Sequence, residues 1–238
     1  MLKKQIRKAK RKLSGMLSGN DAKYGKLSFS QGGEDLIINT VFTLRGIQKP
    51  TYIDIGANHP FRLSNTAIFY LRGARGINVE ANPLLVELFK QERPEDTNLN
   101  VGIADQAGEL DFYIMEDDTL STFSREECEK MQASGQKLAG VRKVKLVTVA
   151  DILEQHARGI CPDLLTIDVE GLDAAILRSI DFSRYRPKVI CVEAAEYSPI
   201  GAGERRSELI DFLVDKGYYE YANTNLNAIM VERSFWFI

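Results

Sequence analysis

The feature that most constrains the fold is a repeated alternation of short apolar strands with helical segments. Each of five predicted strands carries an acid or is directly followed by one: Asp54, Glu80, Asp105, Asp168 and Glu193. Strand–helix alternation is typical of an α/β fold with a parallel sheet. Because ligands bind such sheets outside the carboxyl ends of the strands, the five acids are expected at one ligand-binding edge.

The strands of this pattern are predicted at residues 51–55, 76–80, 98–104, 163–168 and 188–193, and helices at 63–71, 84–91, 149–156, 172–180 and 204–216. Two further strands, 218–222 and 228–232, flank the turn-like Asn-Thr-Asn-Leu-Asn and predict an antiparallel pair. Residues 109–148 interrupt the alternation and are interpreted as an insertion that forms a substrate lid. An earlier helix lies within 29–44, capped by Ser30 and buried through Leu36, Ile37, Thr40, Val41 and Leu44.

The first strand and the turn after it, Thr51–Pro60, resemble the opening of a nucleotide-binding domain. Asp54 lies in an apolar run, where a buried carboxylate is costly unless it is paired. Gly56 has no side chain and Asn58 tolerates a positive φ, so the backbone of the turn can approach a ligand closely. An ordinary strand–loop–helix corner is the structural alternative.

Charge is unevenly distributed along the 238 residues. Residues 1–12 hold seven Lys or Arg and no acid, although the net charge of the whole chain is −2. The acidic remainder argues against broad nucleic-acid binding. The three cysteines are far apart and predict neither a disulfide framework nor a zinc site. With no apolar stretch long enough for a membrane span or a signal peptide, we expect a cytoplasmic protein.

Residues 1–17 predict a basic helix with one apolar stripe, followed by a linker at 18–28. Such a helix can lie on an anionic membrane surface, which would place the protein at the inner face of the membrane. The alternatives are a helix packed on its own domain or on a partner, or a frayed tail. The domain proper is expected at 29–238.

Glu80 lies 24 residues after Gly56, at the end of the second strand. An acid at about this separation binds the ribose diol in both NAD enzymes and methyltransferases. The G-x-G-x-x-G motif that binds a pyrophosphate is incomplete, because Asn58 and Phe61 occupy the second and third glycine positions. A cofactor without phosphates, S-adenosylmethionine, fits this loop better than NAD does.

Four motifs together resemble the FkbM-type S-adenosylmethionine-dependent methyltransferases: Ser30–Asp35 (SQGGED), Tyr52–Asn58 (YIDIGAN), Val79–Pro83 (VEANP) and Thr166–Gly171 (TIDVEG). The resemblance implies a class I methyltransferase fold with sheet order 3-2-1-4-5-7-6, and O-methylation of a sugar hydroxyl in a glycan, glycolipid or glycosylated natural product. By this resemblance Asp54, Gly56 and Asn58 meet the methionine part of the cofactor, Glu80 the ribose, and Asn82 and Asp105 the adenosine side. Gln31, in the first motif, is expected to fold over the cofactor pocket.

A sugar hydroxyl is a poor nucleophile, so a base or a metal is needed as its proton leaves. His59 is a candidate base because its unperturbed pKa is near neutrality, and its alternative role is a hydrogen bond that fixes the loop. Asp168 and Glu170 project the same way from an extended segment, and Glu193 follows the next strand. These carboxylates are candidates for the base or for binding Mg²⁺. Ser121, Thr122 and Ser124 are assigned to helix capping rather than to substrate binding.

Two other classes of function compete with the methyltransferase. An NAD-dependent oxidoreductase or epimerase is allowed by Glu80 and disfavoured by the missing glycines. A non-catalytic binding module would keep the fold and use the basic helix as a tether.

Overall fold

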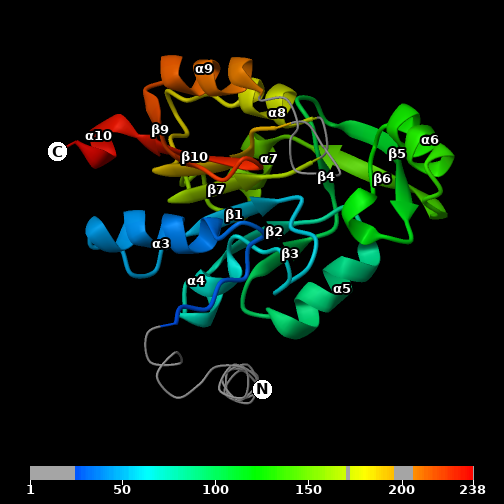
Figure 1. Cartoon of the computed structure of the whole chain (residues 1–238), viewed down its shortest axis with the longest axis horizontal. Coiled ribbons are helices and arrows are strands. Elements are labelled where there is room, and N and C mark those ends of the chain that lie inside the picture. The colour runs from blue at the N-terminus through cyan, green and yellow to red at the C-terminus, as the bar shows by residue number, and fades with distance from the viewer. Residues whose placement is uncertain (1–24, 170–171, 196–205, 238) are drawn as a thin grey trace.

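A computed structural model describes residues 25–169, 172–195 and 206–237. Its main feature is a seven-stranded sheet in the order β3-β2-β1-β7-β8-β10-β9 (Figure 1). The strands are β1 (Tyr52–Ile55), β2 (Gly76–Val79), β3 (Thr97–Leu99), β7 (Leu164–Ile167), β8 (Val189–Glu193), β9 (Tyr218–Asn223) and β10 (Asn227–Glu232). Renumbered within this sheet, the order is 3-2-1-4-5-7-6, as the resemblance implied.

The first five strands of the sheet are parallel, and β10 runs antiparallel to both β8 and β9. The apolar residues of β1 and β7 are buried on both faces, as is typical of parallel strands covered by helices. Ile55 is in register with Val79 on one side and with Ile167 on the other. The turns that follow these three strands therefore leave the sheet at the same edge.

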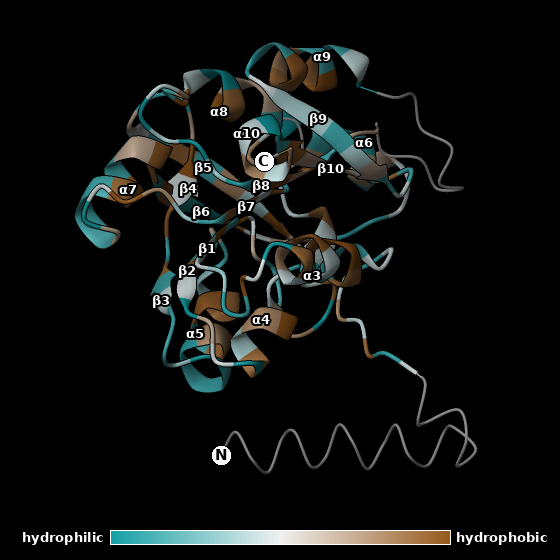
Figure 2. Ribbon diagram, turned by 90° about the vertical axis from the view of Figure 1, so that its left-hand side faces the viewer, coloured by the Kyte–Doolittle hydropathy of each residue, from teal (hydrophilic) through white to brown (hydrophobic). Residues whose placement is uncertain are grey.

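Helices cover both faces of the sheet (Figure 2). One face packs against α7 (Val149–His156), α8 (Asp173–Ser179) and α9 (Ser207–Asp215) through a core that includes Ile152, Ile176 and Leu213. The other face packs against α3 (Glu34–Leu44) and α4 (Ala67–Leu71), through a core that includes Phe42 and Phe69. The short α10 (Arg233–Trp236) adds partly buried aromatic rings to this second core.

The set of buried residues on α3 differs in part from the predicted set. Its buried apolar residues are Ile38, Val41 and Phe42, whereas Leu44 is exposed. The N-cap position is Gly33, whose φ is 88°. Ser30 lies further from the helix, but its hydroxyl accepts the N–H of Asp35 in the first turn at 3.3 Å and donates to the carboxylate of Asp35 at 3.0 Å. The polar segment before α3 therefore forms a folded turn against the start of the helix.

The expected third strand, 98–104, is two strands in two sheets. Residues Thr97–Leu99 form β3 in the main sheet, and β4 (Gly102–Ile103) belongs to a second sheet of order β4-β6-β5. The other strands of that sheet are β5 (Gly108–Met115) and β6 (Leu138–Val147). Between them lie the 3-10 helix η1 (Asp118–Leu120) and α6 (Arg125–Ala133). The insertion thus forms a small sheet beside the main one (Figure 1).

A further helix, α5 (Pro83–Glu92), follows β2 and has Pro83 at its first position. Within the described residues no helix is both long and apolar enough to cross a membrane. The basic helix expected at 1–17 lies outside the described residues.

Candidate active site

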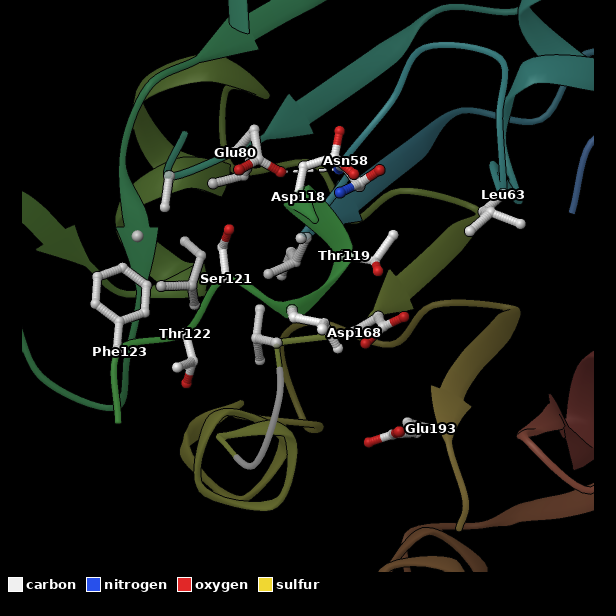
Figure 3. Close-up of a pocket in the computed structure, with 18 of the residues that line it drawn as sticks. Asn58, Leu63, Glu80, Asp118, Thr119, Ser121, Thr122, Phe123, Asp168 and Glu193 are labelled. Atoms are coloured by element: carbon white, nitrogen blue, oxygen red, sulfur yellow. Dashed lines mark hydrogen bonds between the residues drawn. The ribbon is translucent and has the colours of Figure 1, made fainter. Parts of the chain in front are cut away.

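A cavity of about 470 Å³ lies at the carboxyl ends of β1, β2, β7 and β8 (Figure 3). The turn after β1 and the end of β2 form one wall, and the η1 segment of the insertion forms another. Of the residues expected in the site, Gln31, Gly56, Asn58, Glu80, Asp168 and Glu193 line it. Its volume is in the range of cofactor and small-molecule pockets.

The turn after β1 requires a glycine. Gly56 has a φ of 74°, and a Cβ there would lie 1.8 Å from the carbonyl oxygen of Asp168. The N–H of Asp168 donates to the carbonyl of Ile55 at 3.0 Å, which continues the pairing of β1 with β7. Asn58 also has a positive φ, 47°. This close approach places Asp168 directly beside the turn.

Glu80 is buried at the end of β2, where its carboxylate joins two loops. One oxygen accepts the N–H of Asn58 at 2.8 Å and the other accepts the N–H of Asn82 at 2.7 Å. Burial raises the pKa of Glu80 to about 7, against the opposing effect of these two hydrogen bonds. Each carboxylate oxygen has two lone pairs, so Glu80 can still accept hydrogen bonds from a ligand in the cavity.

Asp54 is not among the residues that line the cavity. Alternation along β1 turns Asp54 to the opposite face from Ile55. There it accepts a hydrogen bond from the hydroxyl of Thr66 at 2.6 Å, and burial raises its pKa. Asp54 therefore supports the chain next to the Gly56 turn and does not form part of the cavity wall.

The positive charge that acts on this buried carboxylate is that of Arg93, which contacts Thr66, the hydrogen-bond donor to Asp54, and which the sequence analysis did not single out. Arg93 is fully buried and pairs with Asp96 at 2.8 Å. It also donates to the hydroxyls of Tyr52 and Thr66, at 2.9 and 3.1 Å, and to the carbonyl of Pro60 at 3.3 Å. These contacts tie the end of α5 to β1 and to the loop that follows it. A lone arginine after a helix gives no periodic signal by which sequence could have found this role.

Asn82 and Asp105 are also placed away from the cavity lining. The side chain of Asn82 caps α5 by accepting the N–H of Leu84 at 3.0 Å. Asp105 is exposed after β4, in the second sheet, because the predicted third strand is divided. The position expected for Asp105, after β3, holds Asn100, which donates to the carbonyls of Glu80 and Ala81.

The sequence left two roles open for His59, a base or a hydrogen bond that fixes the loop. The geometry of the ring fits the second role. Its Nδ1 accepts the N–H groups of Phe61 and Arg62, both at 3.1 Å, and the ring does not line the cavity. Burial lowers the pKa of His59, and the charge of Arg62 acts in the same direction. The ring is therefore a neutral acceptor that holds the loop after β1.

The carboxylates at the ends of β7 and β8 both face the cavity (Figure 3). Asp168 is exposed toward it, and Glu193 pairs with Arg206 at 2.9 Å. Glu170 lies outside the described residues. Within the part of the chain that the structure describes, no group of three or more His, Cys, Asp or Glu side chains is arranged to hold a metal ion.

The insertion contributes more of the cavity than a lid interpretation implied. Ser121 and Thr122 line the cavity, whereas Ser124 caps α6 by accepting the N–H of Glu127. Asp118, in η1, lines it too and pairs with Arg62 at 2.5 Å. The capping assignment was therefore right for Ser124 alone. Sequence could not show that this segment returns to the edge of the main sheet.

The mouth of the cavity is built by segments that are distant in the sequence. Gln31 precedes α3 and Asn227 begins β10, and both line the cavity. Glu34 joins them: its carboxylate accepts from Gly32 N at 2.8 Å, Thr224 Oγ1 at 2.7 Å and Asn227 Nδ2 at 3.1 Å. These hydrogen bonds hold the segment before α3 against the β9–β10 hairpin.

The strand order, with a cavity at the carboxyl ends of its parallel strands, is that of the class I S-adenosylmethionine-dependent methyltransferases. A family model described as the methyltransferase FkbM domain matches residues 54–219, and the chain belongs to that family.

Solved structures similar to this chain include several methyltransferases. The methyltransferase FkbM of Methylobacillus flagellatus is 11% identical with a TM-score of 0.44, over 77% of this chain and 44% of that one. This chain thus spans less than half of that protein's length. A putative caffeoyl-CoA O-methyltransferase from Staphylococcus aureus is 10% identical with a TM-score of 0.49, over 94% of this chain and 99% of that one. No curated protein matches the chain.

Proposed function

We propose that the chain is an S-adenosylmethionine-dependent O-methyltransferase that acts on a sugar hydroxyl in a glycan, glycolipid or glycosylated natural product. The observation that carries this proposal is the cavity at the strand ends, with Glu80 held at its wall by two backbone N–H groups. An acid at the end of the second strand is suited to a ribose diol, because its two oxygens accept from two hydroxyls.

The residues that line the cavity fit this cofactor. Glu80 would bind the ribose, and the backbone of the Gly56 turn would approach the methionine part. The side-chain oxygens of Asn58 and Asn65 are buried, line the cavity and have no hydrogen-bond partner. They are acceptors suited to a donor such as the cofactor's ammonium group. When bound, the cofactor supplies an electrophilic methyl group, and alignment with the acceptor provides much of the rate.

The mouth of the cavity supports a polyhydroxyl acceptor. Its wall carries the amides of Gln31, Asn65 and Asn227 together with the carboxylates of Asp168 and Glu193. Amides and carboxylates both hydrogen-bond hydroxyl groups. We assign the base to Asp168, because its main chain adjoins the Gly56 turn and its carboxylate faces the cavity (Figure 3). In this role the Asp168 carboxylate would take the proton of the acceptor hydroxyl while the hydroxyl oxygen bonds to the methyl carbon and the carbon–sulfur bond breaks, so that neutral S-adenosylhomocysteine leaves.

Calorimetric titration with S-adenosylmethionine and, separately, with NAD tests the cofactor. We expect micromolar binding of S-adenosylmethionine that Glu80→Ala abolishes. Glu87→Ala, which removes an exposed carboxylate from α5, is the matched control and should bind as the wild type does. Binding of NAD alone would favour an oxidoreductase, and binding of neither would favour a non-catalytic module.

Transfer of a labelled methyl group tests the acceptor class. Neutral glycosides are expected to accept the label, and Asp168→Asn to slow transfer by about 10²–10⁴-fold, the usual contribution of a general base. If only amine or thiol acceptors are labelled, the O-methyltransferase assignment is wrong although the cofactor is right.

A further inference from the structure

The charges on the cavity wall are of one sign. Four carboxylates line it, those of Glu80, Asp118, Asp168 and Glu193, and no Lys or Arg is among its described lining residues. Arg62 and Arg206 pair with Asp118 and Glu193 from outside the lining set. A cleft lined by charges of one sign attracts ligands of the other sign and repels those of the same sign.

Two buried acceptors on the same wall have no hydrogen-bond partner. The unpartnered buried atoms among the cavity residues include the amide oxygens of Asn58 and Asn65, both acceptors. The amide nitrogen of Asn65 is already used, since it donates to Thr166 Oγ1 at 3.2 Å. A ligand that satisfies this wall brings hydrogen-bond donors and positive charge.

We propose that this wall selects the cofactor by charge, so that the cavity discriminates the cationic sulfonium from the neutral thioether left after methyl transfer, with Asp168 as the principal specificity-determining residue. The inference rests on the proposed function. S-adenosylmethionine carries one more positive charge than S-adenosylhomocysteine, and the two are otherwise alike except for the methyl group. Electrostatic complementarity is therefore the main means by which a wall of fixed shape tells them apart.

Asp168 has this role because of its position. A Cβ on Gly56 would lie 1.8 Å from its carbonyl oxygen, so its backbone adjoins the turn where the methionine part is expected. Figure 3 shows its side chain between η1 and the end of β8, facing the cavity. Glu80 lies at the ribose end, on the other side of the turn, and its two oxygens are held by backbone N–H groups.

The inference predicts a ligand-dependent effect of Asp168→Asn. Titrations use three ligands: S-adenosylmethionine, S-adenosylhomocysteine and sinefungin, an analogue that carries a protonated amine in place of the sulfonium. The substitution should weaken binding of the two cationic ligands by roughly threefold to tenfold, as expected for one charge pair near a surface. It should leave the affinity for S-adenosylhomocysteine unchanged. The loss should shrink at high ionic strength, because Asp168 is exposed.

Two further variants complete the test. Asp211→Asn removes an exposed carboxylate on α9, outside the cavity lining, and should change none of the three affinities. Asp118→Asn removes a carboxylate that Arg62 already pairs, so we expect its effect to be common to the three ligands rather than selective for the cationic ones. Unchanged binding of S-adenosylhomocysteine by Asp168→Asn and Asp211→Asn shows that these two variants are folded.

The outcomes separate this inference from the function on which it rests. If Asp168→Asn changes the three affinities by a common factor, or not at all, charge selection is overturned and the cofactor assignment stands. If the wild type binds none of the three ligands, the proposed function fails, and charge selection fails with it.

Discussion

Glu80 is the residue at which proton binding and cofactor binding are expected to compete. Without a ligand, burial keeps the pKa of its carboxyl at about 7. Ribose hydroxyls that donate to the carboxylate would stabilise the ionised form, so the pKa falls on binding. Below pH 7 the cavity must therefore lose a proton before it holds the cofactor well.

We expect the dissociation constant for S-adenosylmethionine to rise as pH falls below about 7, by up to tenfold per pH unit, and to be constant above it. Titrations between about pH 5.5 and 8.5, an interval centred on that pKa, measure how the dissociation constant depends on pH. Glu80→Gln cannot ionise, so its weaker binding should be independent of pH over the same interval. An affinity for wild type that rises toward acid pH would show that the sign is wrong.

His59 gives a second prediction at this scale. The structure uses Nδ1 as an acceptor for two backbone N–H groups. An asparagine oxygen can serve the same purpose in a turn. His59→Asn should therefore retain kcat within a few-fold, whereas His59→Ala should lower stability by about 1 kcal/mol through the lost hydrogen bonds. A loss of 10² or more in kcat with His59→Asn would instead identify the ring as the base.

At the scale of elements, η1 is attached to the rest of the site through Arg62 and Asp118. Their ion pair joins the loop after β1 to the wall formed by the insertion. Side-chain exposure is 51% for Arg62 and 29% for Asp118, so the pair is partly screened by solvent. A pair of this kind contributes at most about 1 kcal/mol.

A double-mutant cycle for cofactor affinity measures this attachment. Arg62→Ala is expected to weaken cofactor binding by up to about fivefold, since η1 loses one support. In the Asp118→Asn background the same substitution should have little further effect. Additive effects of the two substitutions would mean that the ion pair does not hold η1 over the cavity.

The elements also show what the sequence could and could not predict. The continuous apolar runs of β7 and β8 and the strict alternation with helices predicted the sheet, and the hairpin β9–β10 was predicted to be antiparallel. The stripe predicted for α3 was right for Val41 and, in part, for Leu36 and Ile37, which pack against the core. It was wrong for Thr40 and Leu44, which are exposed. The run 98–104 was assigned to one strand because its composition carries no mark of the change of sheet at Asn100.

Of the six predicted residues that line the cavity, five lie where the main chain leaves the sheet at the common edge: Gly56, Asn58, Glu80, Asp168 and Glu193. The sixth, Gln31, comes from the segment before α3. Asp54 does not line the cavity, because strand alternation assigns it to the far face. The contribution of η1 could not be predicted, since it depends on how two sheets pack rather than on any local pattern.

At the scale of the whole molecule, stability depends on one charged group in the interior. Arg93 bonds to residues of β1, of the loop before α4 and of the segment after α5. Removal of one partner of a buried ion pair leaves the other uncompensated, which typically costs 3–5 kcal/mol. Arg93→Met should therefore lower the free energy of unfolding by about 3–5 kcal/mol.

Urea denaturation measures this loss. Arg75→Met, which removes a partly exposed arginine 3.8 Å from Glu95, should cost less than about 1 kcal/mol. Addition of Asp96→Asn to Arg93→Met should restore part of the stability, because the unpaired charge is then gone. If Arg93→Met were as mild as Arg75→Met, the pair would not be a support of the fold.

The clamp made by Glu34 has a consequence for the order in which the site is completed. Its partners, Thr224 and Asn227, are 190 and 193 residues further along the chain. During synthesis, β1, β2 and β7 leave the ribosome well before the hairpin that Glu34 holds. The mouth of the cavity therefore cannot be completed until nearly the whole chain has been made.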